Sequence, residues 1–293
     1  MSTLLADAVE KVAEEGGHAA EHGAGHGGGE ASGAEIIHHI TDTQVWHFFK
    51  DVEIHLPEFH LFGLDLSISK HVLMLWISGA LVFLLFRGMA KSMQREKAGI
   101  ARGGFALFEM LVLFVRDEIA IKSMGEKLGR KLTPFLLTTF FFILFANLLG
   151  LIPFMATATG NVSATAALAV MVFILVQVQG VIHNGAMGYI KSFIPSGVPA
   201  PLAAIIFPIE ILSQFTRHFA LCIRLFANMI AGHVVILSLI TLIFVFGTVL
   251  ISPFSVGLAL FIYLLEILVA FIQAYIFTML AAMFIGMAAH PEH

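Results

Sequence analysis

From residue 66 to its end, the chain alternates long apolar stretches with short polar segments. A helix that crosses a membrane needs about 20 predominantly apolar residues. Stretches of about that length or more cover 66–86, 134–152, 164–190, 200–246 and 254–289. The pattern predicts an all-α integral membrane protein with about five membrane helices, in a membrane domain that covers 66–293.

One more apolar stretch, 103–121, carries Glu109 and a run of charges at 116–118. Its length would allow it to span, but charges along one side are typical of an amphipathic helix that lies at the membrane surface. Basic residues flank it on both sides, so both of its ends belong on one side of the membrane. We therefore predict an interfacial helix here rather than a further span.

The last two predicted helices are longer than a membrane is thick. At 1.5 Å per residue, about 45 helical residues run roughly 68 Å, whereas the hydrocarbon core is about 30 Å thick. Each stretch is therefore either a re-entrant pair or one strongly tilted helix. Length mismatch normally gives only modest tilt, so strong tilt would need a partner surface to support it.

Composition and charge agree with a membrane protein, since 58% of the residues are hydrophobic and 12% are charged. The single Cys222 excludes an intramolecular disulfide and a cysteine-based metal site. Residues 1–70 hold twelve Asp or Glu and three Lys or Arg, whereas 87–131 hold ten Lys or Arg and five Asp or Glu. Because basic residues near membrane helices accumulate in the cytoplasm, we predict that the N-terminus is outside and the C-terminus cytoplasmic.

Residues 1–65 form an acidic, His- and Gly-rich region that we predict to be extracytoplasmic. The region lacks the basic start and the continuous apolar run of a secretory signal. His18, His22 and His26 are spaced at four and are of a type that binds metals. The surrounding glycines disfavour a helix, so a solvated tail is the favoured interpretation.

Arg224 lies inside about forty residues of almost unbroken apolar sequence. A charged side chain at bilayer depth costs between about 3 and 17 kcal/mol, so such a residue points to a function. Glu210, Arg217 and Arg224 are seven positions apart and share one helix face, with Ser213 near the same stripe. The alternative is plain helix packing with an arginine that reaches the interface, which suits Arg217 better than Arg224.

The last predicted helix carries a second set of polar residues. Glu266 and Gln273 are seven positions apart in otherwise apolar sequence, and a lone carboxylate in such a setting tends to be neutral. His233 lies about half a turn round the helix from Arg224, and histidine titrates near physiological pH. We predict that His233 and Glu266 form a proton relay, although a structural polar role fits His233 alone equally well.

Asn147 is a lone amide in a predicted span, and an interhelical hydrogen bond is as good an account of it as a place on a water path. The polar residues as a whole form two clusters. Glu210, Ser213 and Arg217 lie toward the cytoplasm. The cluster toward mid-membrane or the outside consists of Asn147, Asn228, His233, Glu266 and Gln273. Arg224 lies between them, where its charge would repel passing protons yet attract a mobile anion supplied by a partner.

The segments "IRLFANMIAGH" and "EILVAFIQAYIF" resemble the a-subunit of the membrane (Fo) sector of F-type rotary ATP synthases. The resemblance covers about 66–289. It implies that the two long last helices are strongly tilted and lie against a ring of c-subunits, each with one carboxylate. It also implies that protons enter by one half-channel, are carried by the rotating ring and leave by the other, and that b-type peripheral stalk subunits and the rest of the F1Fo complex are partners. The acidic N-terminal 65 residues exceed the short mitochondrial pattern of this family and favour a bacterial inner membrane.

The resemblance further implies roles for single residues. Arg224 corresponds to the essential arginine that blocks a direct proton leak and holds the deprotonated ring carboxylate. Asn228 and Gln273 correspond to polar residues beside it, and Glu210 to a carboxylate of the inner half-channel. Many bacterial members have a carboxylate where this chain has His233 and a histidine where it has Glu266, and the exchange keeps one imidazole and one carboxylate.

Two other classes of protein compete. A secondary transporter or channel would use the same buried charges, but it usually shows internal repeats, and none is visible. A haem-binding cytochrome would need ligands from a set with no clear pairing on facing helices, namely His71, His183, His218 and His233. Since the chain has no G-x-x-x-x-G-K-[ST] motif, we expect the ATP chemistry in partner subunits. We also predict no catalytic residue, cofactor, metal or nucleic-acid partner for this chain.

Overall fold

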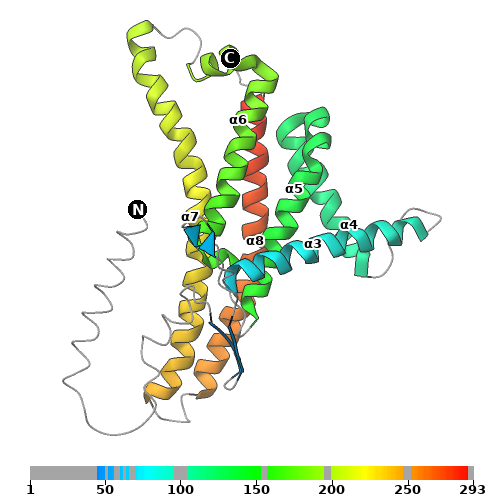
Figure 1. The fold of residues 1–293 in the computed structure, drawn as a ribbon, viewed down its shortest axis with the longest axis vertical. Coiled ribbons are helices and arrows are strands. Elements are labelled where there is room, and N and C mark those ends of the chain that lie inside the picture. Colours follow the sequence, from blue (N-terminus) through cyan, green and yellow to red (C-terminus); the bar gives the residue numbers. More distant parts are fainter. Residues whose placement is uncertain are drawn as a thin grey trace. The chain divides into compact units, whose positions relative to one another are not determined.

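The computed structural model describes residues 45–49, 52–55, 60–61, 64–65, 70–95, 104–152, 157–194, 199–246 and 252–289. The elements, labelled as in Figure 1, are β1 (Val45–Phe49), β2 (Val52–His55), β3 (His60–Leu61), β4 (Leu64–Asp65), α3 (Lys70–Arg95), α4 (Gly104–Phe114), η1 (Val115–Ile121), α5 (Lys122–Leu151), η2 (Ala158–Gly160), α6 (Val162–Ser192), α7 (Ala200–Phe246) and α8 (Ser252–Ala289). Most of the predicted extracytoplasmic region 1–65, including His18, His22 and His26, lies outside the described residues. Its described part forms two small antiparallel hairpins, in which β1 pairs with β2 and β3 with β4.

The fold class predicted from the apolar pattern is confirmed. By length and composition, five helical stretches can cross a membrane: Lys70–Ser92, Ala106–Leu151, Val162–Ser192, Pro201–Ile236 and Pro253–Ala289. The last two helices, α7 and α8, are 47 and 38 residues long, as the apolar pattern led us to expect. Their tilt in a bilayer stays a prediction, as does the domain boundary at residue 65.

The chain divides into two compact units. One unit combines residues 1–41 with 233–262, so its described part is the end of α7 and the beginning of α8. The other combines 42–232 with 263–293 and contains α3 to α6, most of α7 and the second part of α8. The candidate site lies in this larger unit, apart from His233.

The predicted interfacial helix 103–121 is one arm of a helical hairpin. α4 continues into η1, and the chain then turns at Gly125, whose φ of 77° and ψ of 167° are accessible to glycine without steric penalty. η1 packs along α5, since Val115 and Ala120 are fully buried and a Cβ on Gly129 would lie only 2.8 Å from the carbonyl oxygen of Ala120. Figure 1 shows the two arms side by side. Packing against α5 was not foreseen, and the position of this arm at a membrane surface stays a prediction.

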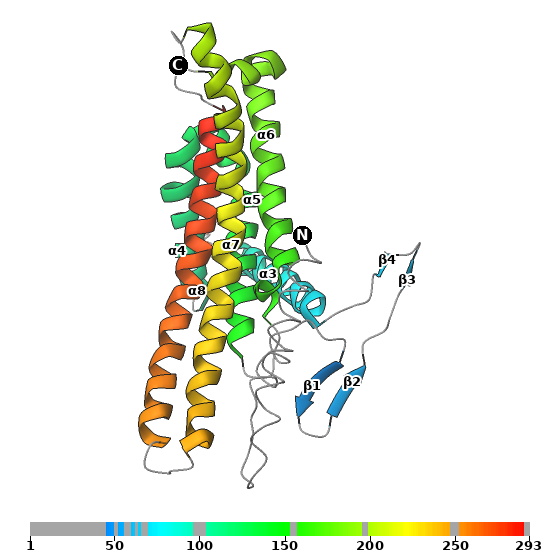
Figure 2. The same cartoon turned by 90° about the vertical axis from the view of Figure 1, so that its left-hand side faces the viewer.

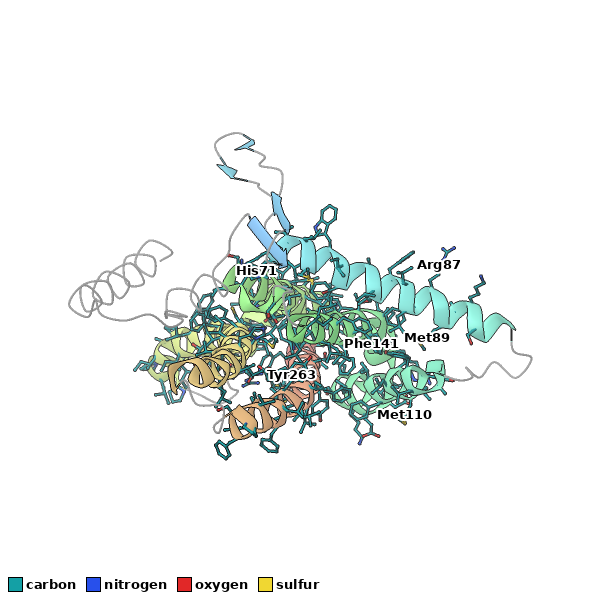
Figure 3. The ribbon with its side chains drawn as sticks, turned by 90° about the horizontal axis from the view of Figure 1, so that it is seen from below. His71, Arg87, Met89, Met110, Phe141 and Tyr263 are labelled. Carbon is teal, nitrogen blue, oxygen red and sulfur yellow. The ribbon has the colours of Figure 1, made fainter. Side chains whose placement is uncertain are left out.

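Phenylalanines on α5 join the helices of the larger unit. Phe140 and Phe141 are fully buried. The Phe141 ring lies 5.5 Å from that of Phe86 on α3, and the Phe140 ring lies 5.7 Å from that of Phe271 on α8. Both pairs are nearly perpendicular, the favoured edge-to-face arrangement. Figure 3 shows Phe141 inside the bundle, whereas Arg87 on α3 points away from it.

A second glycine turn redirects the end of α6. Gly185 has a φ of 70° and a ψ of 159°, so the helix is interrupted there. The Tyr189 ring beyond the turn lies directly on Gly180, where any Cβ would overlap it. Asn184 donates a hydrogen bond to the carbonyl oxygen of Ala288 at 2.9 Å, which ties this turn to the end of α8. The turn therefore depends on contacts between helices as well as on the glycine.

Candidate functional site

Arg224 is an exposed cation on α7. Leu221, Leu225 and Met229 recur at helical spacing and are almost completely buried, so they form the face that packs into the bundle. Arg224 lies on the flank of that face and is exposed. Among the residues that the structure describes, it forms no ion pair.

The part of α8 that lies beside Arg224 is anchored to its backbone. Gln273 is buried, and its Nε2 donates a hydrogen bond of 2.9 Å to the carbonyl oxygen of Arg224. Figure 2 shows α8 alongside α7 in this part of the larger unit. The structure therefore brings Arg224 and Gln273 together, as the family resemblance implied. The contact is to the arginine backbone and not to its guanidinium.

Glu210 and Arg217 form an ion pair on α7, and they lie about four and two turns before Arg224. Arg217 Nη2 lies 3.4 Å from Glu210 Oε1, and the two side chains are 38% and 36% exposed. Ser213, which lies between these two residues in the sequence, has a half-buried side chain. Their common helix face thus places two of the three predicted inner residues in direct contact.

A cavity of about 550 Å³ lies beside this pair. Its polar lining consists of Ser123, Tyr189, Ser192, Glu210, Gln214, Arg217 and His218. The Gly125 turn and the end of α8 supply further walls. Gly286 on α8 meets the chain so closely that a Cβ there would overlap the carbonyl oxygen of Ser123. The two glycines therefore shape the cavity by letting backbone segments approach.

Sequence reasoning missed the hydrogen-bond network at this cavity. Tyr189 Oη donates to Gln177 Oε1 at 3.0 Å, and Gln177 Nε2 donates to Gln214 Oε1 at 3.3 Å. His218 Nδ1 contacts the carbonyl oxygen of Gln214 at 2.9 Å. The signal available in the sequence was the polar pair Gln214 and His218, spaced at four like residues that share a helix face.

Glu266 is buried against α7. It is 7% exposed, and a Cβ on Gly232 would overlap its Oε1, so only glycine allows the carboxylate this close to the helix backbone. Glu266 and Gln273 therefore share the α8 face that meets α7, as their spacing predicted. His233 belongs to the other compact unit, so its pairing with Glu266 stays a prediction. Asn228, one turn beyond Arg224, is half-buried.

Asn147 belongs to a separate buried polar cluster. Thr159 Oγ1 donates to Asn147 Oδ1 at 2.7 Å, and both side chains are fully buried. The carbonyl oxygen of Thr157, two residues before Thr159, lies 2.8 Å from His71 Nδ1 on α3. These contacts join α3, α5 and η2, which gives Asn147 the structural hydrogen bond that was one of its two interpretations. Its role on a water path stays a prediction.

Comparison with known proteins identifies the relatives of this chain. The sequence profile of the ATP synthase A chain family matches residues 72–286. The chain is 47% identical over 262 residues to ATP synthase subunit a of Chloroherpeton thalassium. The aligned part covers 88% of this chain and 78% of that protein. The chain is 47% identical over 293 residues to subunit a of Anaeromyxobacter dehalogenans, covering 94% and 73%. It is also 48% identical over 230 residues to subunit a of Myxococcus xanthus, covering 78% and 75%. These matches decide against the transporter and cytochrome alternatives.

Proposed function

This chain belongs to the ATP synthase A chain family, and we propose that it is the proton-translocating stator subunit of an F-type ATP synthase. It provides two aqueous half-channels to carboxylates on a c-subunit ring, with Arg224 between them. The subunit is itself non-catalytic, and it couples proton flow to ring rotation and to ATP synthesis by its partners. It lies in a bacterial inner membrane with its N-terminus outside and its C-terminus in the cytoplasm.

The observation that carries the proposal is the setting of Arg224. The side chain is exposed and has no ion pair among the described residues. Phe219 and Ile223 beside it are exposed as well, at 48% and 38%. A cation on an apolar membrane surface is costly unless an anion meets it. A ring carboxylate that loses its proton supplies that anion. Charge-assisted hydrogen bonds from the guanidinium then stabilise the carboxylate in place of water.

The inner half-channel is assigned to the cavity beside Glu210 and Arg217. One wall of that cavity is the Gly125 turn, which lies within the basic segment 87–131. Basic segments accumulate on the cytoplasmic side, so the cavity opens toward the cytoplasm. Glu210 accepts and releases protons there, while Ser213 and Arg217 orient water and the carboxylate.

The outer half-channel is assigned to the polar residues on the other side of Arg224. Glu266 and Gln273 lie on the α8 face that meets α7. Asn228 and His233 follow Arg224 along α7, and a proton shared by His233 and Glu266 would pass from them to the ring carboxylate. Asn147 contributes to the same path from α5.

The two paths give rotation a direction because neither crosses the membrane alone. A proton from the outer path neutralises a ring carboxylate, which can then leave Arg224 and enter the lipid. After the ring has turned, the carboxylate releases its proton into the inner path. The deprotonated group is drawn back to Arg224, whose positive charge also repels any proton that would pass directly between the paths.

The test replaces Arg224 by Ala in the assembled complex. ATP-driven acidification of inverted membrane vesicles should disappear, while passive proton leak rises or stays the same. Arg87→Ala is the matched control, because that arginine points away from the bundle (Figure 3), and it should pump normally. Pumping by Arg224→Ala near the unsubstituted rate, in a complex that assembles, would rule out the proposed role of this residue.

A further inference from the structure

His218 is a buried histidine with a fixed orientation. It is 5% exposed. Its ring lies 5.1 Å from that of Phe173 on α6, nearly perpendicular to it, and 5.2 Å from that of Phe284 on α8. Two aromatic neighbours on different helices leave the imidazole little rotational freedom, so its two nitrogen atoms have defined surroundings.

The hydrogen bond at Nδ1 determines the tautomer of the neutral ring. A carbonyl oxygen only accepts hydrogen bonds, so Nδ1, which lies 2.9 Å from the Gln214 carbonyl oxygen, carries the proton. Nε2 is then the acceptor nitrogen. It is buried, and it has no hydrogen-bond partner within the described part of the chain. A purely structural role would leave this polar atom desolvated without a hydrogen bond to offset the cost.

His218 lines the cavity that also contains Glu210 and Arg217. The titratable and charged groups that line this cavity are Tyr189 from α6 and Glu210 and Arg217 from α7, among described residues. The cavity residues contributed by α5 and α8 carry no titratable side chain. A histidine with a buried acceptor nitrogen that has no hydrogen-bond partner among the described residues therefore lines a polar space in which a carboxylate is paired with an arginine.

We propose that His218 is a proton-relay residue of this cavity, in addition to Glu210, and the proposal rests on the assignment of the cavity as the inner half-channel. During ATP-driven pumping, Nε2 binds a proton that comes from the cytoplasm by way of the Glu210 carboxylate or water, which gives an imidazolium. The same N–H bond then breaks as the proton passes on to water toward the ring carboxylate, and the imidazole returns to its neutral tautomer. No other bond changes, and Nδ1 keeps its proton throughout.

The relay matters most when protons are scarce. A neutral imidazole nitrogen can bind a proton and release it again, so it shortens the distance that each scarce proton must cross through water. Without it, protons must pass from Glu210 to the ring carboxylate through water alone, and pumping should fail at a lower pH. A residue that only packs between Phe173 and Phe284 would instead change the rate by one factor at every pH.

Two variants test this, His218→Gln and His218→Phe, because they replace the ring by a non-titrating amide and by a ring of similar size. ATP-driven pumping by inverted vesicles is measured from pH 6 to 9, and passive proton flux through vesicles stripped of the soluble sector is measured over the same range. We expect near-normal rates at acidic pH and a several-fold loss at alkaline pH in both variants. His183→Gln is the matched control, because its Nδ1 contacts the Gln179 carbonyl oxygen at 3.0 Å but it does not line the cavity, and its profile should not shift.

The outcomes are separable from those of the Arg224 test. If Arg224→Ala stops pumping but both His218 variants keep the unsubstituted pH profile, the relay is wrong and the half-channel function stands. A uniform loss at every pH, or failure of both variants to assemble, would make His218 a packing residue and overturn the relay as well. If Arg224→Ala pumps normally, the proposed half-channel function is wrong, and the relay that rests on it is wrong as well.

Discussion

Arg217 and Arg224 lie two turns apart on the same helix, yet their electrostatic surroundings differ. Arg217 lines a polar cavity and contacts the Glu210 carboxylate at 3.4 Å. Arg224 lies among exposed apolar side chains and has no ion pair in the described parts of the chain. Residue type and helix face alone therefore do not assign a role to an arginine on this helix. Arg217 is balanced by a carboxylate of its own chain, whereas the partner anion for Arg224 is the one that we propose.

The largest expected effect is the loss of pumping in Arg224→Ala. Arg224→Lys separates charge from geometry, because the ammonium group keeps the positive charge but replaces the planar, bidentate guanidinium by a point charge. We expect little or no recovery of pumping in the same vesicle assay. Full recovery would show that charge alone is sufficient at this position.

Gly232→Ala should have the next largest effect. The added Cβ overlaps Glu266 Oε1, and such overpacking costs about 1–3 kcal/mol and shifts the side chain. We expect most ATP-driven pumping to be lost from a complex that still assembles on native gels. Gly257→Ala is the control, since a Cβ there meets nothing within 4 Å. Unchanged pumping in Gly232→Ala would mean that the position of Glu266 is not important.

Gln273→Leu should have an intermediate effect. It removes a hydrogen bond to the Arg224 backbone, worth about 1 kcal/mol, and replaces the amide by an apolar side chain of similar size. Pumping should fall several-fold, with no increase in passive leak, because the arginine charge is still present. Gln179→Leu on α6 is the control, a buried glutamine away from this contact. An equal loss in the control would trace the defect to general packing.

Arg217→Ala should have the smallest effect. Its pair with Glu210 is more than a third exposed, and such pairs contribute about 0.2–1 kcal/mol. We expect a small change in thermal stability and only a partial fall in pumping. Arg130→Ala, which breaks the exposed pair with Glu126 at 2.9 Å, is the control for stability. A loss as complete as that in Arg224→Ala would remove the distinction between the two arginines.

The parts of the site that follow helix periodicity could be predicted from the sequence. Glu210 and Arg217 were expected on one face and are in contact, and Glu266 and Gln273 were expected on one face and both meet α7. His218 was considered only as a possible haem ligand, and its place at the cavity depends on Phe173 and Phe284 from two other helices. No local pattern relates residues so far apart in the chain.

The membrane class, the two long last helices and the isolated arginine could all be predicted from the sequence. These properties follow from apolar length and from the 3.6-residue period, which are local. The packing of α4 and η1, the turn of α6 and the side chains around the cavity could not be predicted from the sequence, because they depend on contacts between distant segments. Those features depend on Gly125 and Gly185 adopting positive φ and on the close approach of the Ser123 backbone to Gly286. A glycine permits such conformations without requiring them, so the choice is made by the packing of distant segments.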